Sequence, residues 1–113
     1  MVTQSLTQEI IQLQADFCSA LSDPTRLLIL YALSDGPSNV TELTNELSTS
    51  QPTISRHLKV LRERGLVHTV RSGTTITYSL TDKRLIDAID LMRAVMRDRI
   101  AYHANLIEEL NAE

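Results

Sequence analysis

The feature that most constrains the fold is a pair of short amphipathic segments separated by a few polar residues. Asn39 and Glu42 lie three positions apart, the spacing at which each side chain can bond the backbone N–H of the other at the start of a helix. A second helix is predicted from an N-cap at Ser50 to Gly65, a residue type that commonly ends helices. The sequence therefore predicts two short helices joined by a tight turn over residues 39–64.

After this helix pair the spacing of the apolar residues changes from three or four to two, the period of a β-strand. A turn is predicted at residues 71–74, where small and polar residues surround a glycine. A hairpin is therefore expected over residues 66–80. The residues expected to face inward are Leu66, Val70, Ile76, Tyr78 and Leu80.

Helices are also predicted on both sides of this region. Asp23 followed by Pro24 is typical of an N-cap and a first turn, and starts a helix that runs through Leu33. Residues 6–22 and 82–110 each carry apolar side chains at helical spacing. Because the chain is too short to cover the long last helix, a second subunit is expected to do so. The residues expected in the dimer interface are Leu6, Ile10, Leu13, Phe17, Leu85, Ile89, Met92, Met96 and His103.

Length and composition indicate that residues 1–113 form one domain, which is mainly α-helical and contains a small β-hairpin. Of the 113 residues 42% are hydrophobic, and there are only three glycines and three prolines. The single cysteine excludes an internal disulfide and a paired-cysteine zinc site. No stretch reaches the roughly 18 apolar residues of a membrane span, and the first residues lack a secretory pattern, so a cytoplasmic location is expected.

The positive charge is concentrated in the second helix of the pair and in the hairpin. The formal net charge of the chain is −3, yet residues 50–79 carry five Lys or Arg side chains and one Glu. On a helical wheel the buried direction is set by Ile54, Leu58 and Leu61, and the opposite face is polar and cationic. His57 lies about 60° from the buried direction, which predicts a packed, hydrogen-bonded side chain.

Cationic and short hydrogen-bonding side chains at the start of such a helix suit a DNA groove, since they can contact base edges and phosphates. A merely solvated surface helix is the alternative, and the adjoining basic hairpin favours DNA. The residues expected to contact DNA are Ser50, Gln51, Thr53, Ser55, Arg56, Lys59, Arg62, Arg71, Thr74 and Thr75.

Three motifs carry a family resemblance: Asp23-Pro24-Thr25-Arg26, SQPTISRHLKVLRERGLV over residues 50–67, and Tyr78-Ser79-Leu80. Together they resemble the ArsR/SmtB family of bacterial transcriptional repressors over residues 15–82. The resemblance implies a homodimeric winged helix-turn-helix protein that binds a palindromic DNA operator and leaves it when an inducer binds. It also implies that residues 50–59 read DNA, that residues 71–75 form the wing, and that the first and last helices form the dimer interface.

The ligand patterns that the resemblance brings from metal-sensing members are not intact here. The positions of their cysteine pair match Asn39 and Thr41, which are poor ligands for soft metal ions. Their last-helix pattern falls on Asp82, Arg84, Val95 and Asp98 or, with the register shifted, on Asp90, Met92, His103 and Leu106. No metal or other cofactor is therefore expected.

Cys18 is a candidate sensor of oxidants or soft metal ions, through a lowered thiolate pKa, a cysteine pair across a dimer axis, or a site shared with Met92, Met96 and His103. A single cysteine on a helix is more often a small buried hydrophobic residue. A constitutive repressor without an inducer is the other alternative.

Two other classes of protein fit the sequence less well. An enzyme is not expected, because the sequence has no Gly-rich phosphate loop, no nucleophile elbow and no catalytic pair at a known motif spacing. A winged helix that binds proteins would expose apolar anchor residues, whereas the face around Arg56 and Lys59 is polar and cationic. A DNA-binding regulator is the function that the sequence favours.

Overall fold

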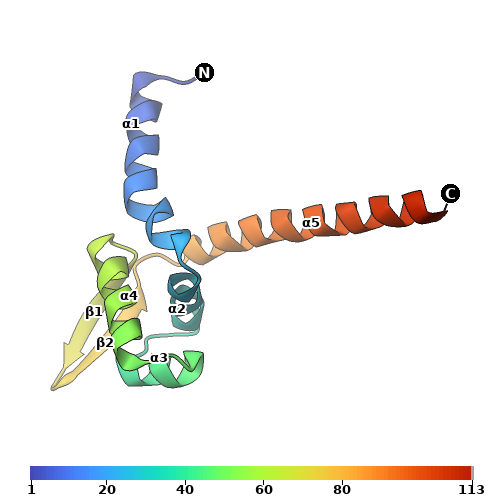
Figure 1. Cartoon of the computed structure of the whole chain (residues 1–113). Coiled ribbons are helices and arrows are strands. Elements are labelled where there is room, and N and C mark those ends of the chain that lie inside the picture. The colour runs from blue at the N-terminus through green and yellow to red at the C-terminus, as the bar shows by residue number, and fades with distance from the viewer. Residues whose placement is uncertain (113) are drawn as a thin grey trace. The chain divides into compact units, whose positions relative to one another are not determined.

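The structure is a computed structural model that describes residues 1–112. The chain divides into two compact units, residues 1–82 and the residues from Lys83 onward, and each is described by itself. The elements of the first unit are α1 (Gln4–Leu13), the π-helix η1 (Gln14–Cys18), the 3₁₀-helix η2 (Ala20–Ser22), α2 (Pro24–Ser34), α3 (Val40–Leu47), α4 (Gln51–Glu63), β1 (Val67–Ser72) and β2 (Thr75–Leu80) (Figure 1). The second unit contains α5 (Arg84–Ala112).

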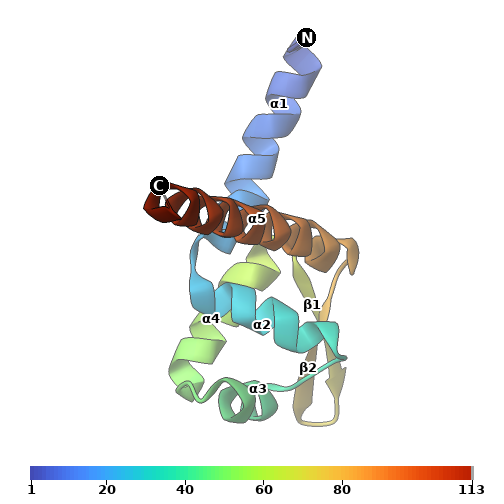
Figure 2. The same ribbon diagram turned by 90° about the vertical axis from the view of Figure 1, so that its right-hand side faces the viewer.

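The core of the first unit lies where α2, α3, α4 and the hairpin meet. α2 packs on α3, α4 and β2, and α4 packs on β1 (Figures 1 and 2). The apolar residues that the sequence places on one stripe of α4 all point into this core. The largest fully buried side chains are Ile29, Leu30, Leu43, Ile54, Leu58 and Leu61.

Side-chain caps start α2 and α3, whereas α4 begins without one. Asn39 Oδ1 accepts the backbone N–H of Glu42 at 2.8 Å, and Glu42 Oε1 accepts that of Asn39 at 3.1 Å, so the predicted capping box is confirmed. Asp23 caps α2 through the N–H of Thr25, as predicted. Ser50 occupies the N-cap position of α4, but its hydroxyl donates to Thr53 Oγ1 at 2.8 Å and caps no backbone group.

The first helix is not one continuous α-helix over residues 6–22, as the sequence predicted. It is α-helical to Leu13, widens into the π-helix η1 and then tightens into the 3₁₀-helix η2. The backbone N–H of Ser19 donates five residues back to the Gln14 carbonyl at 3.0 Å. The Ser19 hydroxyl donates to the Ala15 carbonyl at 2.6 Å, and side-chain bonds of this kind compete with regular helical bonding.

The hairpin lies where it was predicted, but the inward-facing residues of its first strand were predicted wrongly. Val67 pairs with Leu80 and Thr69 with Tyr78, so these residues share the inward face, whereas Val70 pairs with Thr77 on the other face and is 54% exposed. The strand begins at Val67, and counting from Leu66 had shifted the alternation by one residue. Ile76 is also exposed, because it lies near the turn end of the hairpin. The turn contains Gly73, whose φ of 63° favours glycine.

A short bridge that the sequence did not predict adds to the hairpin. The backbone N–H of Ser38 donates to the Tyr78 carbonyl at 3.1 Å, and the N–H of Tyr78 donates to the Ser38 carbonyl at 2.8 Å. The segment before α3 is thereby bonded to β2. This bridge fixes the hairpin against the start of the helix pair.

The long last helix was predicted over residues 82–110 and is observed as α5, with each end displaced by two residues toward the C-terminus. At 29 residues it is the longest element among residues 1–112. None of the helices described here is both long and apolar enough to span a membrane.

Candidate nucleic-acid interface

The two faces of α4 differ sharply in burial and chemistry. Ile54, Leu58 and Leu61 are fully buried, which fixes the rotation of the helix about its axis. The opposite side chains are left in solvent, and among the predicted DNA-contacting residues of α4 only Thr53 is half-buried. The exposed residues of this set are Gln51, Ser55, Arg56, Lys59 and Arg62. We call these five residues the polar face of α4.

The hairpin lies against one edge of this polar face. Ser55, Lys59, Arg62 and Glu63 line an open groove together with Tyr78 of β2. Arg71 pairs with Ile76, two positions before Tyr78, so Arg71 and Tyr78 share one face of the hairpin. Arg71 therefore lies on the hairpin face that contributes Tyr78 to the groove, closer to the turn than Tyr78.

The two threonines of the predicted hairpin contacts lie elsewhere. Thr74 and Thr75 line a second open groove with Asn39, Val40 and Thr41 at the start of α3. Five members of the predicted set are thus divided between two neighbouring grooves that share Tyr78. Sequence reasoning missed this division, because it depends on the bridge between Ser38 and β2.

Arg64 follows the polar face in sequence but is directed away from it. Its Nη1 donates to the carbonyl of Ala15 in η1 at 2.5 Å. The four cations of residues 56–64 therefore do not all lie on one surface. Arg56, Lys59 and Arg62 carry the positive charge of the polar face.

His57 lies at the back of α4, only 7% exposed, in the packed and hydrogen-bonded environment predicted for it. Its Nδ1 lies 3.2 Å from Arg26 Nη1, and its Nε2 lies 3.8 Å from Asp23 Oδ1. Since the guanidinium can only donate, Nδ1 is the acceptor of this hydrogen bond. The start of α2 is thereby linked to the middle of α4.

The carboxyl group of Asp23 has a lowered pKa. Burial disfavours its ionised form, but hydrogen bonds from the backbone N–H groups of Arg26 and Thr25 favour it and outweigh burial, and the electrostatic effects of His57 and Arg26 act in the same direction. Ionised Asp23 therefore stabilises the folded state at pH values above its usual pKa of 3.8, and this contribution is lost as the pH falls through the lower pKa of the folded state.

We expect Asp23→Asn to lower the urea midpoint of unfolding at about pH 7 and to lower it much less at about pH 3, where wild-type Asp23 is losing its charge. Asparagine caps helices about as well as aspartate, so this variant removes the charge and keeps the cap. Asp23→Ala removes both, and its deficit should persist at the lower pH. Equal deficits of Asp23→Asn at the two pH values would contradict the role of the charge.

The apolar residues predicted for the dimer interface are largely exposed in the single chain. Leu6, Ile10, Leu13 and Phe17 lie on α1 and η1, and all four are exposed. On α5, Ile89 is only 4% exposed and Leu85 is half-buried, so Ile89 is already buried in the single chain. Met92, Met96 and His103 lie further along the helix and are exposed. Met92 and Met96 are 56% and 55% exposed. Their burial by a second subunit stays a prediction.

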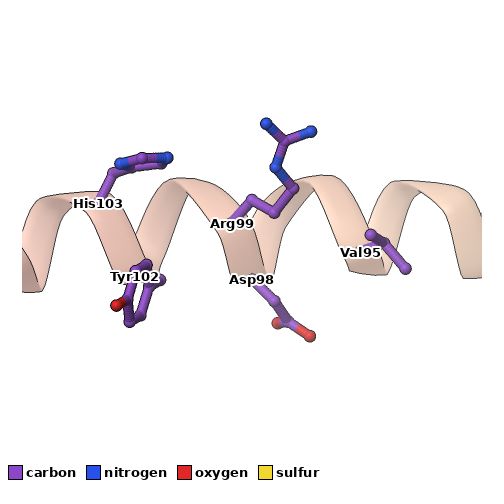
Figure 3. Close-up of a pocket in the computed structure, with 5 residues that line it drawn as sticks. All are labelled: Val95, Asp98, Arg99, Tyr102 and His103. Atoms are coloured by element: carbon purple, nitrogen blue, oxygen red, sulfur yellow. The ribbon is translucent and has the colours of Figure 1, made fainter.

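α5 exposes a second apolar row that sequence reasoning missed. Leu91, Val95, Tyr102 and Leu106 are exposed at spacings of four, seven and four, which lie on one side of a helix. Figure 3 shows Tyr102 and His103 projecting from different sides of α5, with Asp98 near the first and Arg99 near the second. The apolar surface of α5 is thus broader than the single stripe that was predicted.

Cys18 ends η1 and is exposed, so its interpretation as a buried core residue is wrong for the single chain. Within residues 1–112 no group of three or more His, Cys, Asp or Glu side chains is arranged to hold a metal ion. The role of Cys18 as a sensor stays a prediction.

A helix-turn-helix whose second helix exposes a polar, cationic face, followed by a hairpin at its edge, defines a winged helix-turn-helix protein. Residues 23–69 match the family model described as "Bacterial regulatory protein, arsR family". NmtR, a transcriptional regulator of Mycobacterium tuberculosis, is 41% identical over 76 residues, 67% of this chain and 63% of NmtR. The biofilm growth-associated repressor of Xylella fastidiosa is 35% identical over 81 residues, 72% of this chain and 71% of that protein.

The fold also matches the solution structure of the homodimeric winged helix-turn-helix DNA-binding domain Mb0332 from Mycobacterium bovis. The TM-score is 0.74 at 24% identity, over 89% of this chain and 93% of that one. This likeness supports the fold, and the sequence matches establish the family. The chain belongs to the ArsR family of bacterial regulatory proteins.

Proposed function

We propose that the protein is a transcriptional repressor that binds a palindromic DNA operator as a homodimer. The observation that carries the proposal is the polar face of α4, which lies opposite three fully buried residues and is therefore rigidly presented to solvent. Membership of the ArsR family supports the regulatory role. In this proposal α4 enters the major groove, where arginine and glutamine side chains can bond base edges.

The hairpin extends the contact along the DNA backbone. Arg71 shares the hairpin face of Tyr78, which borders the polar face of α4, so its guanidinium can reach a phosphate beside the groove that α4 occupies. Thr74 and Thr75 lie at the turn and, with Thr53 at the start of α4, supply hydroxyl donors for neighbouring phosphates. The Ser50 hydroxyl donates to Thr53 Oγ1, so it would have to turn away from Thr53 to bond a phosphate itself. These contacts set the register, and the polar face of α4 reads the sequence.

Dimerisation follows from the exposed apolar surface of α1 and α5. Nine large apolar residues of α5 are exposed in the single chain, and a 29-residue helix spans about 43 Å. A two-fold partner would cover such a surface and place two copies of α4 about 34–36 Å apart, one turn of duplex DNA. A palindromic operator matches this symmetry.

The proposal includes neither a catalytic activity nor a resident cofactor. Family membership supports a regulator, and four of the six positions of the metal-binding patterns are occupied here by Asn39, Thr41, Arg84 and Val95, which are not the usual ligands. A cytoplasmic location fits a protein that acts on bacterial DNA. Release by an inducer, including an oxidant or soft metal ion at the exposed Cys18, is a separate hypothesis.

The test is a binding selection from a random duplex library, followed by affinity measurements on the selected and scrambled duplexes between about 50 and 300 mM salt. We expect an inverted repeat to be selected and to bind at least about 1,000-fold more tightly than the scrambled duplex. A protein that selects no sequence, or that does not bind at the lowest salt concentration, would overturn the proposal.

Arg71→Ala should weaken binding to selected and scrambled duplexes alike. The loss of one phosphate contact in each subunit should reduce the slope of log affinity against log salt by about one unit per half-site. Arg71→Lys keeps the charge and should leave the slope unchanged. A slope that is the same for wild type and Arg71→Ala would remove the hairpin from the phosphate contacts.

A further inference from the structure

The interruption of the first helix exposes backbone carbonyls that accept side-chain hydrogen bonds. The Ala15 carbonyl accepts Arg64 Nη1 at 2.5 Å, and the Ala20 carbonyl accepts Arg26 Nε at 2.6 Å. Arg26 Nη2 also donates to the Ser19 carbonyl at 3.4 Å. Both arginines thus bond the segment of residues 14–22, which we call the joint.

The same two arginines are also connected to α4, Arg64 as its C-cap residue and Arg26 through a hydrogen bond. Arg64 is the C-cap residue of α4, with its own backbone N–H bonded to the carbonyl of Val60. Arg26 Nη1 bonds His57 Nδ1, in the middle of α4. The attachment points at residues 57 and 64 are separated by seven residues, about 10 Å along the helix axis. Two attachments at this separation fix the direction of α4 relative to the joint, whereas one attachment would allow it to pivot.

The direction of α4 matters because a small rotation of the helix about its C-terminal end displaces its N-terminal end, which is proposed to contact the bases, by a larger distance. The polar face begins at Gln51, and α4 has 13 residues, so its N-terminal end lies about 20 Å from Arg64. A rotation of about 10° about the C-terminal end would move the N-terminal end by about 3.5 Å, which is close to the rise of one base pair.

We propose that Arg26 and Arg64 are positioning residues that set the half-site spacing of the operator. The inference rests on the proposed function, in which α1 belongs to the dimer interface and α4 reads DNA. Because the joint follows α1 directly, the bonds from Arg26 and Arg64 transmit the position of the two-fold axis to each copy of α4. The spacing between the two reading helices is then fixed by these bonds.

The test uses the inverted repeat selected by the wild-type protein and a set of duplexes in which the same half-sites are moved together or apart by one and two base pairs. We expect wild type to bind the selected spacing best. Arg64→Ala should lose affinity mainly for that spacing, so that its preference over the neighbouring spacings falls about fivefold or more, the lower end of typical couplings between separate sites. Arg26→Lys, which cannot bond His57 and both carbonyls together, should have the same effect.

A positioning role is separated from a phosphate contact by the salt dependence. Arg64→Ala should keep the wild-type salt slope, whereas the comparison variant Arg62→Ala, on the polar face, should lose affinity equally at all spacings. Sedimentation and thermal unfolding of Arg64→Ala establish that the variant is folded and dimeric.

Two results would overturn the inference. A spacing profile for both variants that equals the wild-type profile would show that the two arginines do not position α4. A uniform loss for Arg64→Ala with a reduced salt slope would make Arg64 a phosphate contact. In either case wild type still selects an inverted repeat, so the proposed function survives; a wild type that selects no repeat would instead reject the proposed function itself.

Discussion

Met96→Glu is expected to convert the homodimer into monomers. Met96 is 55% exposed on α5, in the stripe that also contains Met92 and Ile89. In the proposed dimer this stripe lies against the partner subunit, so each glutamate would be buried without a positive partner. Leaving a buried charge unpaired costs roughly 3–5 kcal/mol, which weakens the dimer by more than about a hundredfold.

Sedimentation velocity at micromolar concentration measures this effect directly. The matched control is Ala101→Glu, which adds the same charge to α5 on the side opposite the stripe and should leave the dimer intact. The affinity of Met96→Glu for the selected repeat should fall as well, because the two half-site contacts are no longer made together. A Met96→Glu protein that sediments as a dimer would show that the stripe is not in the interface.

Sequence patterns within short stretches of chain predicted α3 and α4 well. The capping box of Asn39 and Glu42 involves residues three apart, and the buried stripe of Ile54, Leu58 and Leu61 follows from the helical period alone. Such features depend on short stretches of chain. The polar face of α4 was predicted for the same reason, since the side opposite a buried stripe is exposed.

The features that the sequence did not predict depend on contacts between residues far apart in the chain, or on the exact residue at which a strand begins. Leu66 is buried as predicted, but its N–H bonds the carbonyl of Leu61 and it precedes the strand, so the alternation counted from it placed Val70 on the wrong face of β1. In the joint, the Ala15 carbonyl is bonded by Arg64, which lies 49 positions further along the chain. No spacing rule within residues 6–22 contains that contact, so an uninterrupted helix was predicted.

Arg56→Ala should produce the largest change in sequence preference. Arg56 is exposed on the polar face, in the N-terminal half of α4, the end that enters the major groove in helix-turn-helix proteins. Its guanidinium can bond two acceptors on the edge of one guanine, and such a contact contributes roughly 1–3 kcal/mol to discrimination. We therefore expect weaker binding to the selected repeat and relaxed preference at one base pair in each half-site.

Competition binding with duplexes that carry each of the four bases at every position of the half-site identifies the base pair that Arg56 reads. Arg56→Lys is the matched control, because it keeps the positive charge but cannot reproduce the planar two-pronged contact. If Arg56 reads a base, the lysine variant should bind scrambled DNA like wild type and still lose the preference at that position. If Arg56 contacts only phosphate, the alanine variant should lose affinity equally for selected and scrambled duplexes, and the lysine variant should keep the wild-type base preference. That result would show that Arg56 does not read a base.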